Sequence, residues 1–553
     1  MSEPNGPRTG RPSTRASRGI VSTPHYLASS AGLNALRRGG SAVDAAITAN
    51  AVLCVVYPHM AGLGGDGFWL IAEPGTGSVH GLNASGPAAR AATLDYYRPH
   101  SVDNEIPSRG PLSVLTVPGA VDGWRMAHNR FGRLPWKDLF EDAITYASDG
   151  IAVSRSLLDW LVQDVPILTR FPATAAIFLP GGCVPGEGHR LLQADLARSF
   201  RTIADHGPRA GFYEGEIAER ICRAIEPHGS PLRVDDFAAF HAEWVAPITA
   251  QYRGYDVYQL PPNTQGFTAL HILNLIEGYD VAAFGDGTAD YYHHLAEAVK
   301  IAFADREEWL TDPNFVDIPV QRLISKEYAD ERRRLIDPHR ALDIANVPAG
   351  IPYAHPHERR APDGDTCFFC AADRDGMVVS IIQSIYHDFG SAVVGGDTGI
   401  VLQNRGAFFA LEQRHPNHLL PGKRTFHTLI PGLVMRGGHP YLAFGSMGGE
   451  GQPQSQAALI TRLIDFGYDV QQAIEAPRWL MGRTWGTRSR NLSLEGRISD
   501  EVVRELKRRG QPVQMVTGWN DNMGHAHAIR IDREQGFLEG GADPRGDGAA
   551  VGY

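Results

Sequence analysis

The sequence predicts a large α+β protein built around a layered core, and three observations lead to this fold class. At 553 residues the chain far exceeds an ordinary domain of about 100–200 residues, so it needs several domains or one unusually large core. Its composition, with 43% hydrophobic residues and 61 glycines, is that of a globular protein with many tight turns. The chain also contains both helical and strand patterns, and two of the strands form a clear hairpin.

The N-terminal part of the chain begins with a tail and continues with a strand and two helices. Residues 1–18 are rich in Pro, Ser, Gly and Arg and lack the apolar segment of a secretory signal, so we expect a disordered tail. Gly19–Thr23 is typical of a strand, and Pro24–Arg38 of a helix that ends at a glycine pair. Ser41, with Asp44 three residues on, predicts a capped helix whose alanines favour burial.

Two further segments carry local signals. The turn at Gly62–Gly67 leads into an apolar strand, and its glycines suit either a backbone held close to a ligand or a tight turn with no ligand. Asp290–Leu310 is the clearest amphipathic helix. Its adjacent His293 and His294 point about 100° apart, so they cannot form a metal pair on one face. We interpret both histidines as surface or packing residues.

Charge and cysteine content exclude several classes of function. The net charge is −10 and the basic residues are scattered, which argues against a nucleic-acid partner. Five cysteines are too few and too oddly numbered for a disulfide framework, so a reducing compartment fits better. No segment approaches the ~20 apolar residues of a membrane span. We therefore expect a cytoplasmic protein with neither a membrane nor a nucleic acid as partner.

A hairpin that follows a polar loop is the most informative segment. The loop, Pro348–Asp365, shows no period, whereas Thr366–Ala372 is typical of a strand. An Asp-Gly turn and a second strand, Met377–Ile385, follow. Folding about this turn brings the end of the second strand opposite Thr366, so we expect the hydroxyl of Ser384 to lie close to Thr366.

Thr366 is a candidate nucleophile, although most internal threonines only cap or fill strands. A cut before it would free an α-amine with a reference pKa of roughly 7.7–8.0, which can take the hydroxyl proton. The same hydroxyl can make the cut by attacking the carbonyl of Asp365, which moves the acyl group from nitrogen to oxygen and leaves an ester for water to remove. We therefore expect self-cleavage between Asp365 and Thr366.

The glycine-rich turn Gly445–Gly451 is a candidate oxyanion hole. Glycines let the backbone turn its N–H groups inward, and a helix expected from Gln452 would add a positive dipole end. A strand-to-helix turn without catalytic duty has the same residue spacing, so both interpretations stay open here.

Motifs along nearly the whole chain point to one family. They are Gly39–Ala46, Leu63–Phe68, Val117–Val121, the Thr366 hairpin, Phe389–Ser391, Gly445–Gly449, Ala542–Arg545 and Val551–Tyr553. In this order they resemble the gamma-glutamyltranspeptidase family, from about Gly19 to Tyr553. The resemblance implies a four-layer αββα sandwich typical of N-terminal-nucleophile hydrolases. It also implies Thr366 as the nucleophile, Ser384 as a second hydroxyl that contacts it, Gly448 and Gly449 as the oxyanion hole, and no cofactor.

The resemblance further implies that the protein is made as a zymogen. After cleavage, a large chain (19–365) and a small chain (366–553) would form one αββα unit as a heterodimer, and a dimer of heterodimers is left open.

The residues that hold the substrate depart from the family pattern. Gamma-glutamyl enzymes bind the α-carboxylate of glutamate with an arginine and its α-amino group with an acid. In place of this arginine, this acid, two serines, an asparagine and a glutamine, the chain has Asn83, Phe408, His427, Thr428, Tyr386 and Arg405. Because arginine binds a carboxylate through two parallel hydrogen bonds, we expect a smaller pocket for an anion without an ammonium group. A loop arginine paired with a nearby carboxylate is the alternative for Arg405.

Four segments look like the branch of the family that hydrolyses oxamate: Tyr57–Met60, Ser384–His387, Gln403–Gly406 and Gly445–Gly449. The resemblance implies an amidohydrolase that converts oxamate to oxalate and ammonia in purine catabolism. One alternative is a gamma-glutamyl hydrolase or transferase acting on glutathione-like substrates. A second is an unprocessed relative that only binds a ligand.

A metal site is a weaker alternative. His355 with His357, His525 with His527, and Cys367 with Cys370 each offer two ligands, whereas structural zinc usually takes four at recognisable spacing. We therefore expect no metal.

Overall fold

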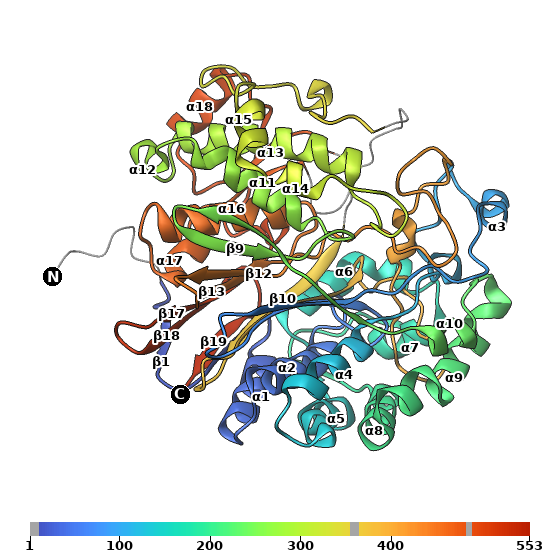
Figure 1. Ribbon diagram of the computed structural model, residues 1–553. Helices are drawn as coiled ribbons and strands as arrows, with labels where there is room; N and C mark the ends of the chain where they lie inside the picture. The colour runs from blue at the N-terminus through green and yellow to red at the C-terminus, as the bar shows by residue number, and fades with distance from the viewer. Residues whose placement is uncertain (1–9, 354–363, 483–488) are drawn as a thin grey trace.

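Two seven-stranded sheets stack face to face in the computed structural model, which describes residues 10–353, 364–482 and 489–553 (Figure 1). The first sheet has the order β1 (Thr14–Ala16), β18 (Phe537–Ala542), β17 (Ala526–Asp532), β13 (His439–Ser446), β12 (Gly432–Arg436), β9 (Tyr255–Gln259) and β8 (Ile248–Tyr252). The second has the order β19 (Ala549–Gly552), β2 (Ile20–Thr23), β10 (Asp365–Ala372), β11 (Val378–Tyr386), β3 (Asp66–Ala72), β4 (Val79–Ala84) and β7 (Glu243–Val245).

Helices cover the outer face of each sheet, which completes the predicted αββα order of layers (Figure 1). The first sheet carries α11 (Gly266–Glu277), α12 (Val281–Phe284), α13 (Ala289–Trp309), α14 (Val320–Leu323), α15 (Lys326–Arg333), α16 (Gly451–Ile464), α17 (Val470–Glu475) and α18 (Asp500–Arg508). The second carries α1 (Tyr26–Arg37), α2 (Ala42–Val56), α4 (Ala120–Phe131), α5 (Glu141–Asp149), α6 (Arg155–Leu168), α7 (Pro172–Phe178), α8 (Ala194–Pro208), α9 (Glu216–Ile225) and α10 (Val234–Ala239).

Smaller elements lie at the periphery of these layers. They are the short helix α3 (Leu94–Tyr97), a two-stranded sheet of β5 (Ile151–Ala152) and β6 (Arg190–Leu191), and a three-stranded sheet of β14 (Trp479–Met481), β15 (Leu492–Glu495) and β16 (Val513–Val516).

Alternate residues of the central strands fill two different cores. Phe68 and Leu70 of β3 face the opposite sheet and pack in a cluster with Phe368 of β10, whereas Trp69 and Ile71 belong to the cluster beneath the helices. Because both faces of the sheet are covered, β3 and β11 are buried along their whole length. A polar side chain on these strands is therefore removed from water.

Local signals in the sequence are reproduced in the N-terminal helices. Ser41 Oγ accepts a hydrogen bond from Asp44 N at 3.2 Å, and the Asp44 carboxylate accepts one from Ser41 N at 2.9 Å. This is the expected capping box, and every residue of α2 is buried. At Gly65, an added Cβ would lie 2.3 Å from the carbonyl oxygen of Ser384, so this turn approaches protein backbone closely. The tight-turn interpretation of Gly62–Gly67 is therefore sufficient.

Two expectations are wrong in part. The disordered tail expected over residues 1–18 does not include Thr14–Ala16, because these residues add β1 to the edge of β18, and Ser13 Oγ donates to Asp469 at 2.9 Å. The helix expected at Asp290–Leu310 exists as α13, but it is buried on nearly all sides rather than amphipathic. Several of its polar residues are paired within the protein, as in the 2.7 Å ion pair between Lys300 and Glu297.

Both sides of the expected cut contribute strands to both sheets. In the second sheet, β10 from the later part of the chain pairs with β2 from the earlier part, and in the first sheet β12 pairs with β9. A break between Asp365 and Thr366 would therefore leave the two pieces joined by sheet hydrogen bonds and shared cores.

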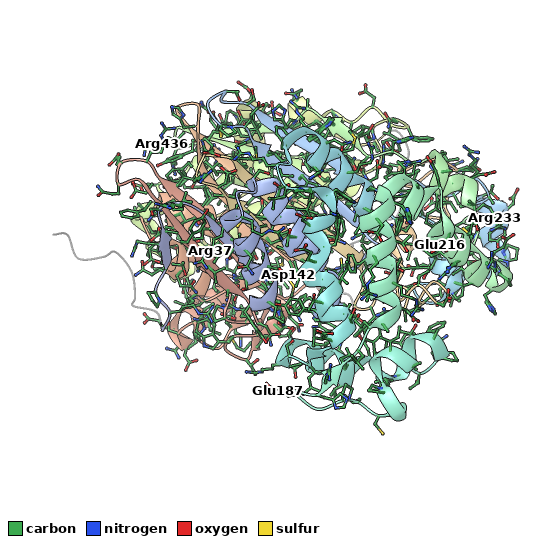
Figure 2. All side chains as sticks on the ribbon, turned by 90° about the horizontal axis from the view of Figure 1, so that it is seen from below. Arg37, Asp142, Glu187, Glu216, Arg233 and Arg436 are labelled. Atoms are coloured by element: carbon green, nitrogen blue, oxygen red, sulfur yellow. The ribbon has the colours of Figure 1, made fainter. Side chains whose placement is uncertain are left out.

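Charges of both signs are spread over the outer surface. Arg37, Arg233 and Arg436 share the face shown in Figure 2 with Asp142, Glu187 and Glu216. Within the described ranges, no helix is long and apolar enough to cross a membrane.

Candidate active site

Thr366 lies at a β-bulge between β10 and β11. Asp365 pairs with Tyr386 and Cys367 pairs with Gln383, so two residues of β11, Ser384 and Ile385, stand against the single Thr366. Thr366 is fully buried. The hairpin thus brings Ser384 opposite Thr366, as its turn predicts. Bulges of this kind often re-aim a side chain beside an active site.

Gln452 is the second residue of α16, a helix that packs on the first sheet, and its side chain reaches Thr366 of the second sheet. Its Nε2 donates to Thr366 Oγ1 at 3.5 Å, while its Oε1 accepts a hydrogen bond from Ile430 N at 3.0 Å. The start of α16 therefore lies beside the candidate nucleophile, as the position of the glycine-rich turn suggested.

Gly448 and Gly449 form the turn between β13 and α16. Their φ angles are 111° and 46°, in the left-handed region that glycine adopts without penalty. The carbonyl of Gly448 accepts a hydrogen bond from Gly451 N at 2.7 Å, and that of Gly449 accepts one from Gln265 Nε2 at 3.0 Å. Both carbonyls are therefore engaged by the protein.

Arg405 is a fully buried cation next to Ser384. Its Nη2 donates to Ser384 Oγ at 3.3 Å, and its guanidinium carbon lies 4.5 Å from the centre of the Tyr386 ring. Within the described residues, Nε and Nη1 have no hydrogen-bond partner. Burial lowers the pKa of Arg405 to about 10, so the side chain stays charged at neutral pH. A buried charge with unused donors is costly unless an anion joins it.

His427 and Thr428 line the same region and also carry unused polar atoms. His427 Nε2 approaches Asp66 Oδ2 to 3.3 Å without the alignment of a hydrogen bond, and the hydroxyl of Thr428 has no partner among the described residues. Burial, and then the charge of Arg405, lowers the pKa of His427 to about 4, so its imidazole is neutral near pH 7. The other carboxylate oxygen of Asp66 accepts from Gly119 N at 3.0 Å and from further donors.

Aromatic rings close the region around Arg405. The Tyr386 ring lies 4.3 Å from the ring of Phe408, which stacks on Phe426 at 4.3 Å. Tyr386 has a φ of 83°, which is unusual for a residue with a side chain. Phe408 supplies an apolar surface here, which cannot bind an ammonium group by charge.

Asn83 is occupied by its neighbours. Its Nδ2 donates to Asn263 Oδ1 at 2.9 Å, and its Oδ1 accepts from Ser85 Oγ at 2.6 Å. The structure thus brings Thr366, Ser384, Tyr386, Arg405, His427 and Thr428 around one buried region, while Asn83 belongs to a hydrogen-bond group beside it.

The paired histidines and cysteines have other surroundings. His525 lies between Asp521 and Tyr57, whose hydroxyl is 3.1 Å from its Nδ1, and His527 Nδ1 lies 3.1 Å from Ser22 Oγ. Cys367 and Cys370 are buried in different cores. His355 and His357 lie outside the described residues. In the described part of the chain, no three His, Cys, Asp or Glu side chains are grouped to hold a metal ion.

Of the two interpretations of His293 and His294, surface residues or packing residues, the structure supports packing. His293 Nε2 is 2.8 Å from the carbonyl of Asp337, and His294 Nδ1 is 2.7 Å from that of Asp290.

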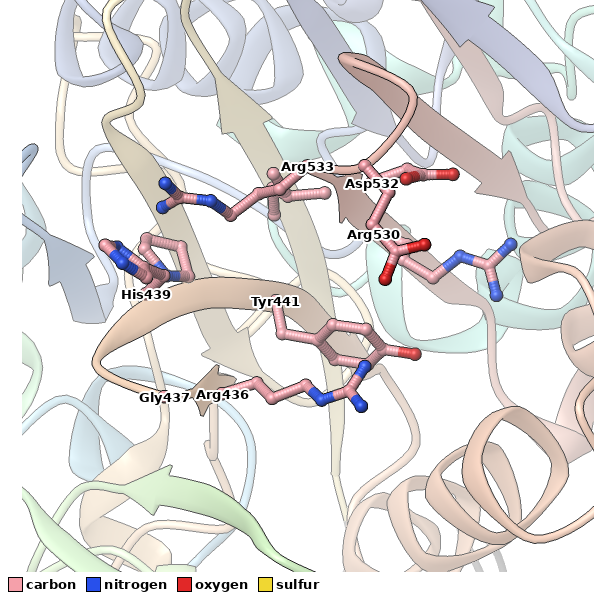
Figure 3. Close-up of a pocket in the computed structure, with 10 residues that line it drawn as sticks. Arg436, Gly437, His439, Tyr441, Arg530, Asp532 and Arg533 are labelled. Atoms are coloured by element: carbon pink, nitrogen blue, oxygen red, sulfur yellow. The ribbon is translucent and has the colours of Figure 1, made fainter.

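A surface hollow at the far end of β13 is separate from this region. It measures about 500 Å³ and is lined by Arg436, His439, Tyr441, Arg530 and Arg533 among others (Figure 3). Its lining includes His439, the first residue of β13, whereas the Gly448 turn follows Ser446, the last residue of that strand. A strand of this length separates the two by roughly 20–25 Å.

Sequence reasoning missed three residues that the fold brings to this region. Asp66 was seen only as part of a glycine-rich turn, although an acid leading into a buried strand is a signal of its own. Gln265 and Gln452 reach the site from other elements and carry no local signal.

The fold defines a class of protein: the N-terminal-nucleophile hydrolases with an αββα sandwich. The family model described as gamma-glutamyltranspeptidase matches residues 28–553. The chain belongs to the gamma-glutamyltranspeptidase family, whose hydrolases and acylases act on amides.

Individual relatives match over nearly the whole chain. It is 48% identical to the "Glutathione hydrolase-like YwrD proenzyme" of Bacillus subtilis, over 96% of this chain and 98% of the relative. It is 42% identical to the "Oxamate amidohydrolase proenzyme" of Klebsiella pneumoniae, over 97% and 98%. Among solved structures, the cephalosporin acylase from Bacillus halodurans superimposes with a TM-score of 0.90 at 36% identity, covering 100% of this chain and 99% of that one.

Proposed function

We propose that the chain cuts itself between Asp365 and Thr366, and that the new terminal Thr366 then hydrolyses the amide of a small carboxylate, for which oxamate is the best candidate. The names of its relatives support the first half, because those quoted above from sequence are described as proenzymes. The pairing of strands from both sides of the cut supports it as well, since the pieces would stay together.

In the proposed reaction, the terminal amine of Thr366 takes the proton from its own hydroxyl as the oxygen attacks the amide carbon of oxamate. The tetrahedral oxyanion is stabilised by the N–H groups of Gly448 and Gly449. The C–N bond breaks, and the leaving nitrogen takes a proton and departs as ammonia. Water then attacks the oxalyl ester on Thr366 Oγ1 and releases oxalate, which restores the free hydroxyl. Ser384 contacts the nucleophile and helps to orient it.

The observation that carries the choice of substrate is Arg405. A fully buried guanidinium with Nε and Nη1 unpaired among the described residues needs an anion, and a planar carboxylate matches its fork of donors. The neighbouring Phe408 and Tyr386 rings offer no charge to an ammonium group. A short carboxylate amide such as oxamate has the anion for Arg405 and carries no ammonium group. A gamma-glutamyl substrate carries an α-amino group, for which these rings provide no charged partner.

A gamma-glutamyl hydrolase is the main alternative, since one relative is named glutathione hydrolase-like. A comparison of substrates separates the two. Purified protein is given oxamate or a gamma-glutamyl anilide, and release of ammonia or of the aniline is measured, with Thr366→Ala as the inactive control. We expect kcat/KM to favour oxamate by ~100-fold or more, as for a site that lacks a partner for one polar group.

The other outcomes are equally informative. A preference for the anilide would mean that Asp66 or another acid holds the ammonium group, and the oxamate assignment would fail. A chain that stays intact and turns over neither substrate would be a binding protein, and the whole proposal would fail.

A further inference from the structure

One buried side chain, Gln265, joins the two loops of the candidate site. It precedes α11 and is fully buried. Its Nε2 donates to the carbonyl of Thr428 at 2.8 Å and to that of Gly449 at 3.0 Å, and its backbone N donates to the carbonyl of His427 at 3.0 Å. The loop of His427–Thr428 and the glycine turn are therefore held at a set distance from each other.

Arg306 of α13 determines which way the Gln265 amide points. Its Nη1 donates to Gln265 Oε1 at 3.2 Å, and its Nη2 donates to Glu450 Oε1 at 2.7 Å. A guanidinium can only donate, so the amide oxygen of Gln265 has to face Arg306 and the NH₂ group has to face the two carbonyls. Arg306 is itself buried, with its guanidinium carbon 3.8 Å from the centre of the Phe303 ring.

This arrangement restrains a turn that glycine would otherwise leave free. Gly448 and Gly449 can adopt many backbone conformations, because neither has a side chain. A trans peptide holds its C=O and the following N–H in opposite directions. The bond from Gly451 N to the Gly448 carbonyl thus sets the direction of the Gly449 N–H, and Gln265 sets the next peptide plane through the Gly449 carbonyl.

We infer that Gln265 and Arg306 are positioning residues, which hold the Gly448–Gly449 turn in the conformation that stabilises the oxyanion and couple it to the loop of His427 and Thr428. This inference rests on the proposed function. It predicts that both self-cleavage and turnover depend on Gln265, because each reaction passes through an oxyanion on the same turn.

The variant Gln265→Glu tests the inference directly. It keeps the size of the side chain and an oxygen for Arg306, but it sets a carboxylate oxygen against the carbonyls of Thr428 and Gly449. We expect kcat to fall by about 10²–10³, the range for loss of an oxyanion-hole donor, while KM for oxamate changes less than about 3-fold. The rate of self-cleavage should fall in parallel.

Gln456→Glu is the matched control. Gln456 is also a buried amide that donates to a backbone carbonyl, that of Ile430 at 2.6 Å, and its oxygen accepts from Gln259 at 2.7 Å, so these hydrogen bonds go elsewhere than the glycine turn. This control should keep kcat and self-cleavage near their wild-type rates, with thermal unfolding measured for both variants. If Gln265→Glu does not fold, Arg306→Lys decides instead, because lysine cannot reach both Gln265 and Glu450 and should lower kcat about tenfold at unchanged KM.

The inference and the proposed function fail differently. A Gln265→Glu protein that folds and keeps the wild-type kcat overturns the positioning role and leaves the proposed hydrolase intact. If Gln265→Glu does not fold, a wild-type kcat in Arg306→Lys has the same consequence. A decrease equal to that of Gln456→Glu overturns it too, since any buried carboxylate would then have the same effect. A wild-type chain that neither cuts itself nor hydrolyses an amide overturns both.

Discussion

Gln452 of α16 donates its side-chain amide to the hydroxyl of Thr366 on β10 at 3.5 Å. The same side chain accepts a hydrogen bond from Ile430 N, so its orientation is set by the protein rather than by the substrate. A fixed donor on the candidate nucleophile limits which way the hydroxyl proton can leave.

Replacing Gln452 by Glu should slow the enzyme without unfolding it. The carboxylate keeps the acceptor for Ile430 N but loses the donor to Thr366, whose hydroxyl would then point its proton at the new side chain. We expect kcat to fall about fivefold, in line with roughly 1 kcal/mol for one hydrogen bond. Steady-state kinetics on oxamate measures this, and an unchanged kcat would show that Gln452 does not orient the nucleophile.

Arg405→Met should weaken substrate binding but not the fold. Replacing a buried charge that has no anionic partner by an apolar side chain should leave the free energy of unfolding unchanged or raise it by about 1 kcal/mol. KM for oxamate should rise by about 100-fold, because charge-assisted hydrogen bonds to the carboxylate are lost. Urea unfolding and kinetics measure the two effects separately.

Lys423→Met is the control for Arg405→Met. Lys423 is also buried, but its Nζ donates to the carbonyls of Pro416 at 2.6 Å and His418 at 3.3 Å, so its removal takes a donor from each and should destabilise the fold. If Arg405→Met destabilises the protein as much as Lys423→Met, Arg405 is part of the folded scaffold and is not waiting for an anion.

Stability should fall as the pH drops below about 6.5. Burial lowers the pKa of His25, His271 and His527 to about 3 and that of His427 to about 4. The unfolded chain therefore binds these protons at higher pH than the folded chain does. The stability is fully present above the unfolded pKa of about 6.5, and each histidine removes roughly 1.4 kcal/mol per pH unit below it, until its own folded pKa is reached.

Urea unfolding between pH 8 and pH 4.5 measures this dependence. His525 acts in the opposite sense, because Asp521 raises its pKa, and it offsets part of the slope. The variant His527→Asn should reduce the slope of the free energy of unfolding against pH by the contribution of about one proton. A free energy of unfolding that is flat down to pH 4.5 would contradict the burial of neutral histidines.

Gly364→Ala should slow self-cleavage and leave the mature enzyme unaffected. Gly364 has a φ of 140°, and a Cβ added there would lie 2.4 Å from the Tyr386 ring, so alanine must displace the backbone before the cut. After the cut, residue 364 belongs to the end of the other chain. A time course of processing on denaturing gels, followed by kinetics of the processed fraction, distinguishes the two stages. Equal processing rates for Gly364→Ala and wild type would disprove the steric role.

The sequence predicts those parts of the fold whose signals are local. The Ser41–Asp44 capping box and the Asp375-Gly376 turn each lie within a few residues, and both form as expected. The closeness of Thr366 and Ser384 follows from that turn by counting along two strands. The burial of α13 is different, because its polar residues are satisfied by partners such as Glu450, which lies 144 positions from Arg306.

The candidate site divides in the same way. Thr366 and the glycine turn stand out by residue type and spacing, and the family resemblance points to Arg405, His427 and Tyr386. Contacts such as Gln265 with Gly449 join positions 184 apart, and no periodicity or short motif encodes such a pair. Gln265 follows β9 and Gly449 follows β13, so the strand order β13-β12-β9 within one sheet brings these residues together.

The most direct test of the account is the intact mass of active, purified protein. If Thr366 is the nucleophile through its own amine, mass spectrometry should find two chains, the smaller of which begins at Thr366 and ends at Tyr553. A single chain of 60.2 kDa in material that releases ammonia from oxamate would contradict the account.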